Sequence, residues 1–297
     1  MATIYTHINQ NKRDTIIIIT MFIGVIAALG WLVGELYFQG GGVPFIGFAL
    51  IISGITSFIS YYNSDKIVLA ISGAKEVTEQ QSPYLHNLVG NLCIGAGLPK
   101  PRIYMINDSA MNAFATGRDP EHGVICFTTG IVEKLDKLEL EGVIAHELSH
   151  IGNYDIRLLS IVSVLVGTIT LIVDWVTRGF LYGGRRSRDN GANGIILLIG
   201  FVFLILSPII ATLIKLAVSR NREYLADASG SLLTRYPDGL ASALEKIAAD
   251  NEVLEAANGA TAHLYISNPL KNKRSAFSNL FNTHPPVEER IKRLREM

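Results

Sequence analysis

The sequence predicts a mainly α-helical integral membrane protein with four transmembrane helices and an α+β domain that carries a small β-sheet. Three observations lead to this fold class. The chain of 297 residues is 49% hydrophobic and has a mean hydropathy of +0.31, which is too apolar for a soluble domain of this size. Four stretches reach the length of about 20 apolar residues that a spanning helix needs. Short strand-like segments lie between the second and third of these stretches.

The four apolar stretches occupy residues 15–34, 43–62, 158–177 and 195–217. The first is longer than the apolar core of a signal peptide, so we expect a retained anchor. The third and fourth contain few charges, and we expect them to span the membrane as well. A buried soluble hairpin is the alternative for this second pair.

The distribution of lysine and arginine sets the expected orientation. Lys12 and Arg13 precede the first stretch, and the loop that follows it has no basic residue. A group of arginines between the third and fourth stretches conflicts with the rule, namely Arg178, Arg185, Arg186 and Arg188. Because the first hairpin usually dominates, we expect both termini and the soluble parts to lie in the cytoplasm.

These stretches divide the chain into four parts: a tail and membrane hairpin (1–62), a first soluble part (63–157), a second hairpin (158–217) and a second soluble part (218–297). Within the first soluble part, apolar and β-branched runs bounded by Gly, Asp and Pro predict strands at 67–71, 102–106, 113–116 and 124–128.

Helices are expected on both sides of the second hairpin. One covers 82–96, and another runs from a plausible N-cap at Asp136 to Asn153, with its continuation into the next apolar stretch left open. After the hairpin, the pattern predicts helices at 219–234, 237–250 and 286–296. The intervening polar segment, 251–282, is expected to be mobile and to act as a lid.

Composition excludes some classes of protein. The formal net charge is zero, so bulk charge gives no reason to expect a nucleic-acid partner. Cys93 and Cys126 lie far apart in a predicted helix and a predicted strand, and we interpret them as core thiols rather than a disulfide framework.

The most specific motif is His146-Glu147-Leu148-Ser149-His150, inside the helix expected to end at Asn153. Imidazoles four residues apart project from one face of a helix, so both can bind one zinc ion. The intervening Glu147 can reach a water molecule at the metal without being a ligand, as a general base of peptide hydrolysis must. The motif predicts a zincin-like metalloprotease domain with one Zn²⁺ per chain.

A catalytic zinc needs a third protein ligand, and the best candidate is Glu223. Glu223 and Asp227 lie one turn apart on a predicted helix, where two carboxylates would repel each other without a nearby cation. We expect Glu223 to bind the metal and Asp227 to accept a hydrogen bond from a ligand imidazole. Two spans separate His150 from Glu223, so both return to the same side of the membrane.

The chain resembles the HtpX family of bacterial membrane zinc endopeptidases, which are related to the CAAX prenyl endopeptidases. The resemblance rests on the combined pattern of two N-terminal spans, NAFATG (112–117), HELSH (146–150), two further spans, REYLAD (222–227), HLYISNPL (263–270) and THPPVEERI (283–291). It implies a multi-pass protein of the bacterial inner membrane with a cytoplasmic active site. It also implies protein or peptide substrates, chiefly membrane or misfolded proteins, in quality control and the stress response.

The same resemblance implies roles for further residues. His146, His150 and Glu223 would bind zinc, and Glu147 would be the general base. Residues Asn112–Thr116 would match the family's edge strand beside the active site, where Asn112, Ala113, Phe114 and Ala115 would align an extended substrate by backbone pairing. His284 and Arg290 are candidates for holding the oxyanion or supporting Asp227.

Two other classes of protein compete with a protease. A metal-binding scaffold would hold zinc without cleaving anything, but such a site needs no base at Glu147. A transporter or channel would place several ionisable residues inside its spans, whereas only Asp174 and Lys215 qualify, both near span ends.

Overall fold

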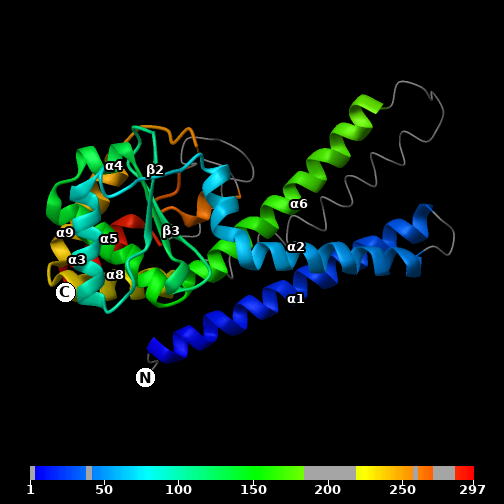
Figure 1. The fold of residues 1–297 in the computed structure, drawn as a ribbon, viewed down its shortest axis with the longest axis horizontal. Helices are drawn as coiled ribbons and strands as arrows, with labels where there is room; N and C mark the ends of the chain where they lie inside the picture. The colour runs from blue at the N-terminus through cyan, green and yellow to red at the C-terminus, as the bar shows by residue number, and fades with distance from the viewer. Residues whose placement is uncertain (1–3, 38–41, 184–218, 257–259, 270–284) are drawn as a thin grey trace.

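The structure is a computed structural model that describes residues 4–37, 42–183, 219–256, 260–269 and 285–297. A globular part contains a small sheet and most of the shorter helices, and three long helices, α1, α2 and α6, extend from it to one side (Figure 1). The helices are α1 (Ile4–Tyr37), α2 (Gly42–Ile71), α3 (Pro83–Ala96), α4 (Thr129–Lys134), α5 (Lys137–Gly152), α6 (Asp155–Gly183), α8 (Arg220–Thr234), α9 (Pro237–Ala249) and α10 (Val287–Arg295).

Two helices of the described residues are long and apolar enough to cross a membrane, over Ile8–Trp31 and Gly42–Ile71. The helices to which these ranges belong, α1 and α2, contain the first two predicted spans, 15–34 and 43–62. The exposed side chains of α2 include Ile55 and Phe58, 56% and 65% exposed, as expected for a surface that faces lipid. The number of candidates rises to three if α5 and α6 are taken as one bent span.

The prediction of four spans is therefore confirmed only in part. The third predicted span, 158–177, lies within α6. The bend of 83° between α5 and α6, together with the burial of α5 in the globular part, makes α5 a poor candidate for crossing a bilayer. The fourth predicted span, 195–217, lies outside the described residues.

The prediction of a strand at 67–71 is wrong, because these residues form the last turns of α2. The helix has one kink, at Asn63, with φ −128° and ψ 15°, and continues through the apolar run. Composition alone does not separate a short buried helix segment from a strand. The strand that joins the sheet here is β1 (Lys75–Glu76), which pairs with β2.

The sheet has four strands in the order β1-β2-β4-β3. The predicted strands β2 (Arg102–Ile106), β3 (Ala113–Thr116) and β4 (Val124–Thr128) are confirmed to the residue. β2 and β4 are parallel, whereas β3 pairs antiparallel with β4 and lies at one edge of the sheet. A short 3-10 helix, η1 (Pro120–His122), connects β3 to β4.

Helix α5 is the centre of the globular part. Asp136 and Glu139 form a reciprocal capping box at its N-terminus, which satisfies backbone donors that the first turn leaves without partners. Almost every later residue is buried, since α5 packs against α3, α8, α9 and β3. The helix ends at Gly152, so it does not continue straight into the next apolar stretch.

The other predicted helices are confirmed to within two residues at each end, as α3, α8, α9 and α10. The expected mobile segment at 251–282 is wrong in part. Residues 260–266 are buried and include the 3-10 helix η2 (Ala262–Leu264). Leu264, Tyr265 and Ile266 anchor this stretch in the core. The prediction missed them because it was based on the polar composition of the whole segment.

Close packing of α5 on α9 depends on Gly142. A Cβ atom at this position would lie 2.6 Å from the backbone nitrogen of Leu240, far inside van der Waals contact. We expect Gly142→Ala to lower the free energy of unfolding by about 1–3 kcal/mol, because a packed backbone must move. Denaturant unfolding of the detergent-solubilised protein measures this.

The matched control is Gly90→Ala in α3, where the nearest atom to the new Cβ is a side-chain carbon of Lys100 at 4.0 Å. This variant should be neutral, or more stable by up to about 1 kcal/mol, since alanine is the better helix former. Equal stability of the two variants would contradict the packing argument.

Candidate metal centre

The paired histidines of α5 converge as the motif predicts. His146 and His150 are 1% and 7% exposed, and their Nε2 atoms lie 3.2 Å apart. Two nitrogens bound to one tetrahedral zinc at about 2.0–2.1 Å lie about 3.3 Å from each other. The separation therefore suits two ligands of a single ion.

Helix α8 brings Glu223 to the same place. Its Oε1 lies 3.6 Å from the Nε2 of His150, and its Oε2 lies 4.0 Å from the Nε2 of His146. One ligand atom from each of the three residues lies within 4.8 Å of the others. A Cβ at Gly230 would lie 3.0 Å from the backbone nitrogen of His146, so this glycine lets α8 approach α5 closely.

Carboxylates fix the orientation of both imidazoles. The Nδ1 of His146 lies 2.9 Å from Asp227, and the Nδ1 of His150 lies 2.9 Å from Asp155. An Nδ1–H that donates to a carboxylate leaves the lone pair on Nε2. In this tautomer, two lone pairs and the Glu223 carboxylate face one another in a buried space, and such a donor set fits a divalent cation.

The charges around His150 also favour a cation. Burial acts to lower the pKa of His150, but the hydrogen bond to Asp155 and the charge of Glu223 outweigh it and raise the pKa to about 9. The same acidic surroundings that favour a proton on this imidazole would favour a metal ion bound to it.

Arg290 of α10 completes the surroundings of His146, although it lies 144 positions away in the chain. Its guanidinium is 2% exposed and donates two hydrogen bonds to Asp227, of 2.8 and 2.7 Å. Burial would raise the pKa of Asp227, but the charge of Arg290 lowers it to about 2. Asp227 is therefore a carboxylate that can accept from His146, and Arg290 also lies 3.4 Å from Glu223.

Glu147 faces β3 from α5. It is 2% exposed, and burial raises its pKa to about 7. The backbone N–H of Ala115 donates to it, and the charges of His150 and Glu223 act on it. A buried carboxyl with a pKa near neutrality can both accept and release a proton, as a general base requires.

Asp155 and Asn11 complete the surroundings of His150, and the sequence analysis missed both. Asp155 is the fifth residue after His150, where it would not share a helix face with it. The bend between α5 and α6 places the Asp155 carboxylate next to the His150 ring. Asn11, on α1, donates to Asp155 at 2.6 Å. An acidic residue just after the motif was a usable signal for Asp155, whereas nothing in the sequence indicated Asn11.

The predicted substrate-aligning residues do form an edge strand, but part of that edge is already paired. The side-chain amide of Asn112 donates to the carbonyl of Ser267 at 3.0 Å, and the N–H of Ile266 donates to the carbonyl of Ala113 at 2.9 Å. Phe114 points away from this edge into the core, with its ring centroid 5.0 Å from that of Tyr265.

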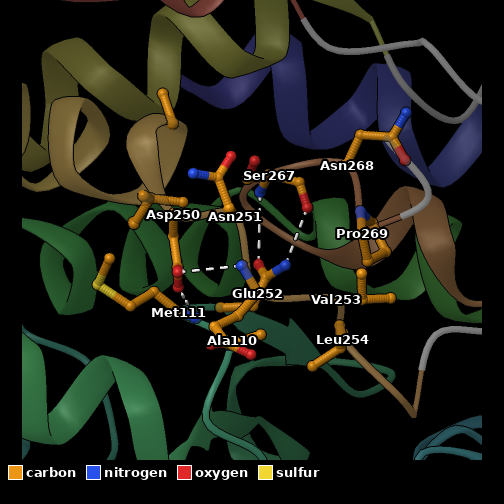
Figure 2. Close-up of a pocket in the computed structure, with 13 residues that line it drawn as sticks. Ala110, Met111, Asp250, Asn251, Glu252, Val253, Leu254, Ser267, Asn268 and Pro269 are labelled. Atoms are coloured by element: carbon orange, nitrogen blue, oxygen red, sulfur yellow. Dashed lines mark hydrogen bonds between the residues drawn. The ribbon is translucent and has the colours of Figure 1, made fainter. Parts of the chain in front are cut away.

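A pocket is lined in part by Asn112. Figure 2 shows its walls, which come from the end of α9 with the segment after it, from the residues before β3, and from the stretch around Ser267. Asp250 accepts a hydrogen bond from the backbone N–H of Met111 at 2.8 Å across it. None of the three candidate metal ligands lines this pocket.

Among the predicted site residues, His284 lies outside the described residues. The structure brings together His146, Glu147, His150, Glu223, Asp227 and Arg290.

Comparison with known proteins gives the family. Residues 79–297 match Peptidase family M48. The chain belongs to this family. Proteins named "Protease HtpX homolog" from Dictyoglomus thermophilum and Tropheryma whipplei (strain Twist) are 48% and 44% identical to it over 295 and 293 residues. Each alignment covers 99% of this chain, with 95% and 98% of the respective relative.

Among solved structures, this M48 protein is similar to one titled "Crystal Structure of S. mikatae Ste24p", with a TM-score of 0.49 and 17% identity. The match covers 97% of this chain and 66% of that one. The M48 family and the HtpX relatives confirm the predicted class, a membrane metalloendopeptidase. Membership of this family also implies a bound metal.

The contact of Asn112 with Ser267 leads to a prediction. Asn112→Ala removes an amide that donates to the Ser267 carbonyl and accepts from the N–H of Ala113 at 3.1 Å. We expect a loss of about 1–3 kcal/mol of stability, because buried backbone groups lose their partner. Hydrogen exchange should rise at residues 265–268.

Asn251→Ala is the matched control, since Asn251 lines the same pocket but is exposed. It should leave exchange at residues 265–268 unchanged. Equal protection of this stretch in the two variants would show that Asn112 does not hold it.

Proposed function

We propose that this chain is a zinc-dependent endopeptidase of the bacterial inner membrane that cleaves membrane or misfolded proteins at the cytoplasmic face, in quality control and the stress response. The observation that carries the proposal is the convergence of His146, His150 and Glu223 beside a buried glutamate with a pKa near 7. The HtpX relatives support the choice of substrate class, and Lys12 and Arg13 before the first span support the orientation.

Zinc is the ion that this donor set fits best, because two imidazoles and one carboxylate with an open fourth position are typical of catalytic zinc. His146, His150 and Glu223 would hold it. When bound, zinc lowers the pKa of a coordinated water and polarises the scissile carbonyl. Asp227 and Asp155 keep the two imidazoles in the ligating tautomer.

Glu147 is proposed to transfer a proton from the attacking water to the leaving amine. In its ionised form it takes a proton from the attacking water, and it then delivers that proton to the amide nitrogen that leaves. The hydrogen bond from Ala115 orients its carboxylate. No covalent bond to the protein forms in this sequence of steps.

The two residues of the C-terminal box have separate proposed roles. Arg290 is proposed to support Asp227 and, through it, His146, because its guanidinium donates two hydrogen bonds to the Asp227 carboxylate. His284 remains the candidate for stabilising the developing oxyanion.

Substrate alignment on β3 is proposed to start at Ala115. Among the described residues no group pairs with its outward carbonyl, whereas Ile266 holds the carbonyl of Ala113. An extended peptide could therefore add to the sheet edge at Ala115 by backbone pairing. Pairing along the full length of Asn112–Ala115 requires Ile266 to move.

We also propose the four-part organisation of the chain, in which two protease segments, 63–157 and 218–297, flank a second membrane hairpin at 158–217. The ligands come from both segments, so the site forms only when they meet.

Replacement of the proposed base tests the mechanism. Glu147→Gln keeps the size of the side chain but cannot take a proton. We expect one zinc per chain, as in the wild type, and cleavage of an unfolded protein such as casein reduced by at least about 100-fold. Metal analysis and the cleavage assay on the same preparation measure both quantities.

His146→Ala is the comparison variant and should lose zinc and activity together. A chelator should abolish wild-type cleavage, and added zinc should restore it. Ordinary turnover by Glu147→Gln would contradict the assigned role, and zinc binding without any cleavage by the wild type would favour a metal-binding scaffold.

A further inference from the structure

Helix α1 reaches the metal centre through its polar N-terminal turns. Asn11 is 2% exposed, while Lys12 and Arg13 beside it are exposed. Its side-chain amide donates to the carboxylate of Asp155 at 2.6 Å and to the carbonyl of Asn153 at 2.8 Å. Both partners belong to the corner between α5 and α6.

This corner sets the orientation of His150. One oxygen of Asp155 accepts from Asn11, and the other lies 2.9 Å from the Nδ1 of His150. A single carboxylate therefore links the amide on α1 to a proposed metal ligand. Rotation of Asp155 would turn or release that imidazole.

The corner is also strained, so it needs support. Tyr154 has a φ of 61°, in the left-handed region that residues with a Cβ rarely adopt. The ammonium group of Lys12 lies 4.8 Å from the centre of the Tyr154 ring. Helix α1 thus contacts all three corner residues, Asn153, Tyr154 and Asp155.

A second link joins α1 to the helix that carries the third ligand. Asp14 accepts a hydrogen bond of 3.0 Å from Arg222, which directly precedes Glu223 and also lies 3.5 Å from Asp155. Two polar residues one turn apart on α1 therefore contact both helical segments that border the site.

We propose that Asn11 is a positioning residue for the metal centre, which it supports by fixing Asp155 and, through it, His150. The inference rests on the proposed zinc site and deepens it: metal affinity depends on how the first membrane helix is seated against the protease domain. In this proposal, helix α1 both attaches the protein to the membrane and helps to position the residues of the zinc site.

The test compares zinc binding in the full-length protein in detergent. Asn11→Leu keeps the branched shape of the side chain, is somewhat larger, and removes the amide. Asn9→Leu is the matched control, because Asn9 is exposed two residues earlier on the same helix. Chelator competition gives the zinc dissociation constant, and thermal unfolding without metal gives the stability of each variant.

We expect Asn11→Leu to bind zinc about three- to tenfold more weakly than Asn9→Leu. Loss of a direct partner of a ligand costs 10- to 100-fold, and Asn11 acts one contact further away. With cobalt in place of zinc, the visible absorption spectrum should change in Asn11→Leu and stay at the wild-type form in the control.

Equal zinc affinity and equal cobalt spectra in the two variants would overturn the inference, even if Asn11→Leu unfolds at a lower temperature. If Asn11→Leu does not fold, Asn11→Ser decides in the same way, since its short hydroxyl cannot reproduce both hydrogen bonds. A wild type that binds no zinc would instead refute the proposed function, so the two failures are distinguishable.

Discussion

The rest of the structure depends on one constraint, the close approach of three buried groups that present electron pairs to one another. These groups are the Nε2 atoms of His146 and His150 and the carboxylate of Glu223. Such groups repel unless a proton or a metal ion lies between them. The surroundings compensate for this arrangement. Asp227 and Asp155 bind the far nitrogens of the imidazoles, and Arg290 of α10 balances the acidic side of the cluster.

The same constraint explains how the chain is arranged around its apolar helices. The histidines precede α6, whereas Glu223 follows the fourth predicted apolar stretch, 195–217, and its helix packs on α5 at Gly230. Between them the chain turns by 83° at the corner after α5, and this turn places Asp155 against His150. Helix α1 contacts that corner through Asn11 and Lys12. The first apolar helix and the candidate metal centre therefore meet at this corner.

Much of this architecture is readable from the sequence, and the exceptions have physical causes. The strands β2, β3 and β4 and the helix of the histidine motif were predictable, because Gly, Pro and capping residues bound them sharply. The run at 67–71 was misassigned because a short buried helix and a strand share one composition. The candidate metal ligands were predictable, the two histidines from their local spacing and Glu223 from its pairing with Asp227. An acidic residue just after the motif was a usable signal for Asp155, but its contact with His150 arises at a corner between two helices. Nothing in the sequence indicated Asn11, because its contacts arise from a packing of distant helices that no local pattern encodes.

The most direct test of the central claim is X-ray absorption spectroscopy at the zinc edge on the purified full-length protein. The account predicts one zinc per chain with only nitrogen and oxygen neighbours at about 2.0–2.2 Å, two of them imidazoles. Sulfur neighbours at about 2.3 Å, or a spectrum without the pair of imidazoles, would contradict it.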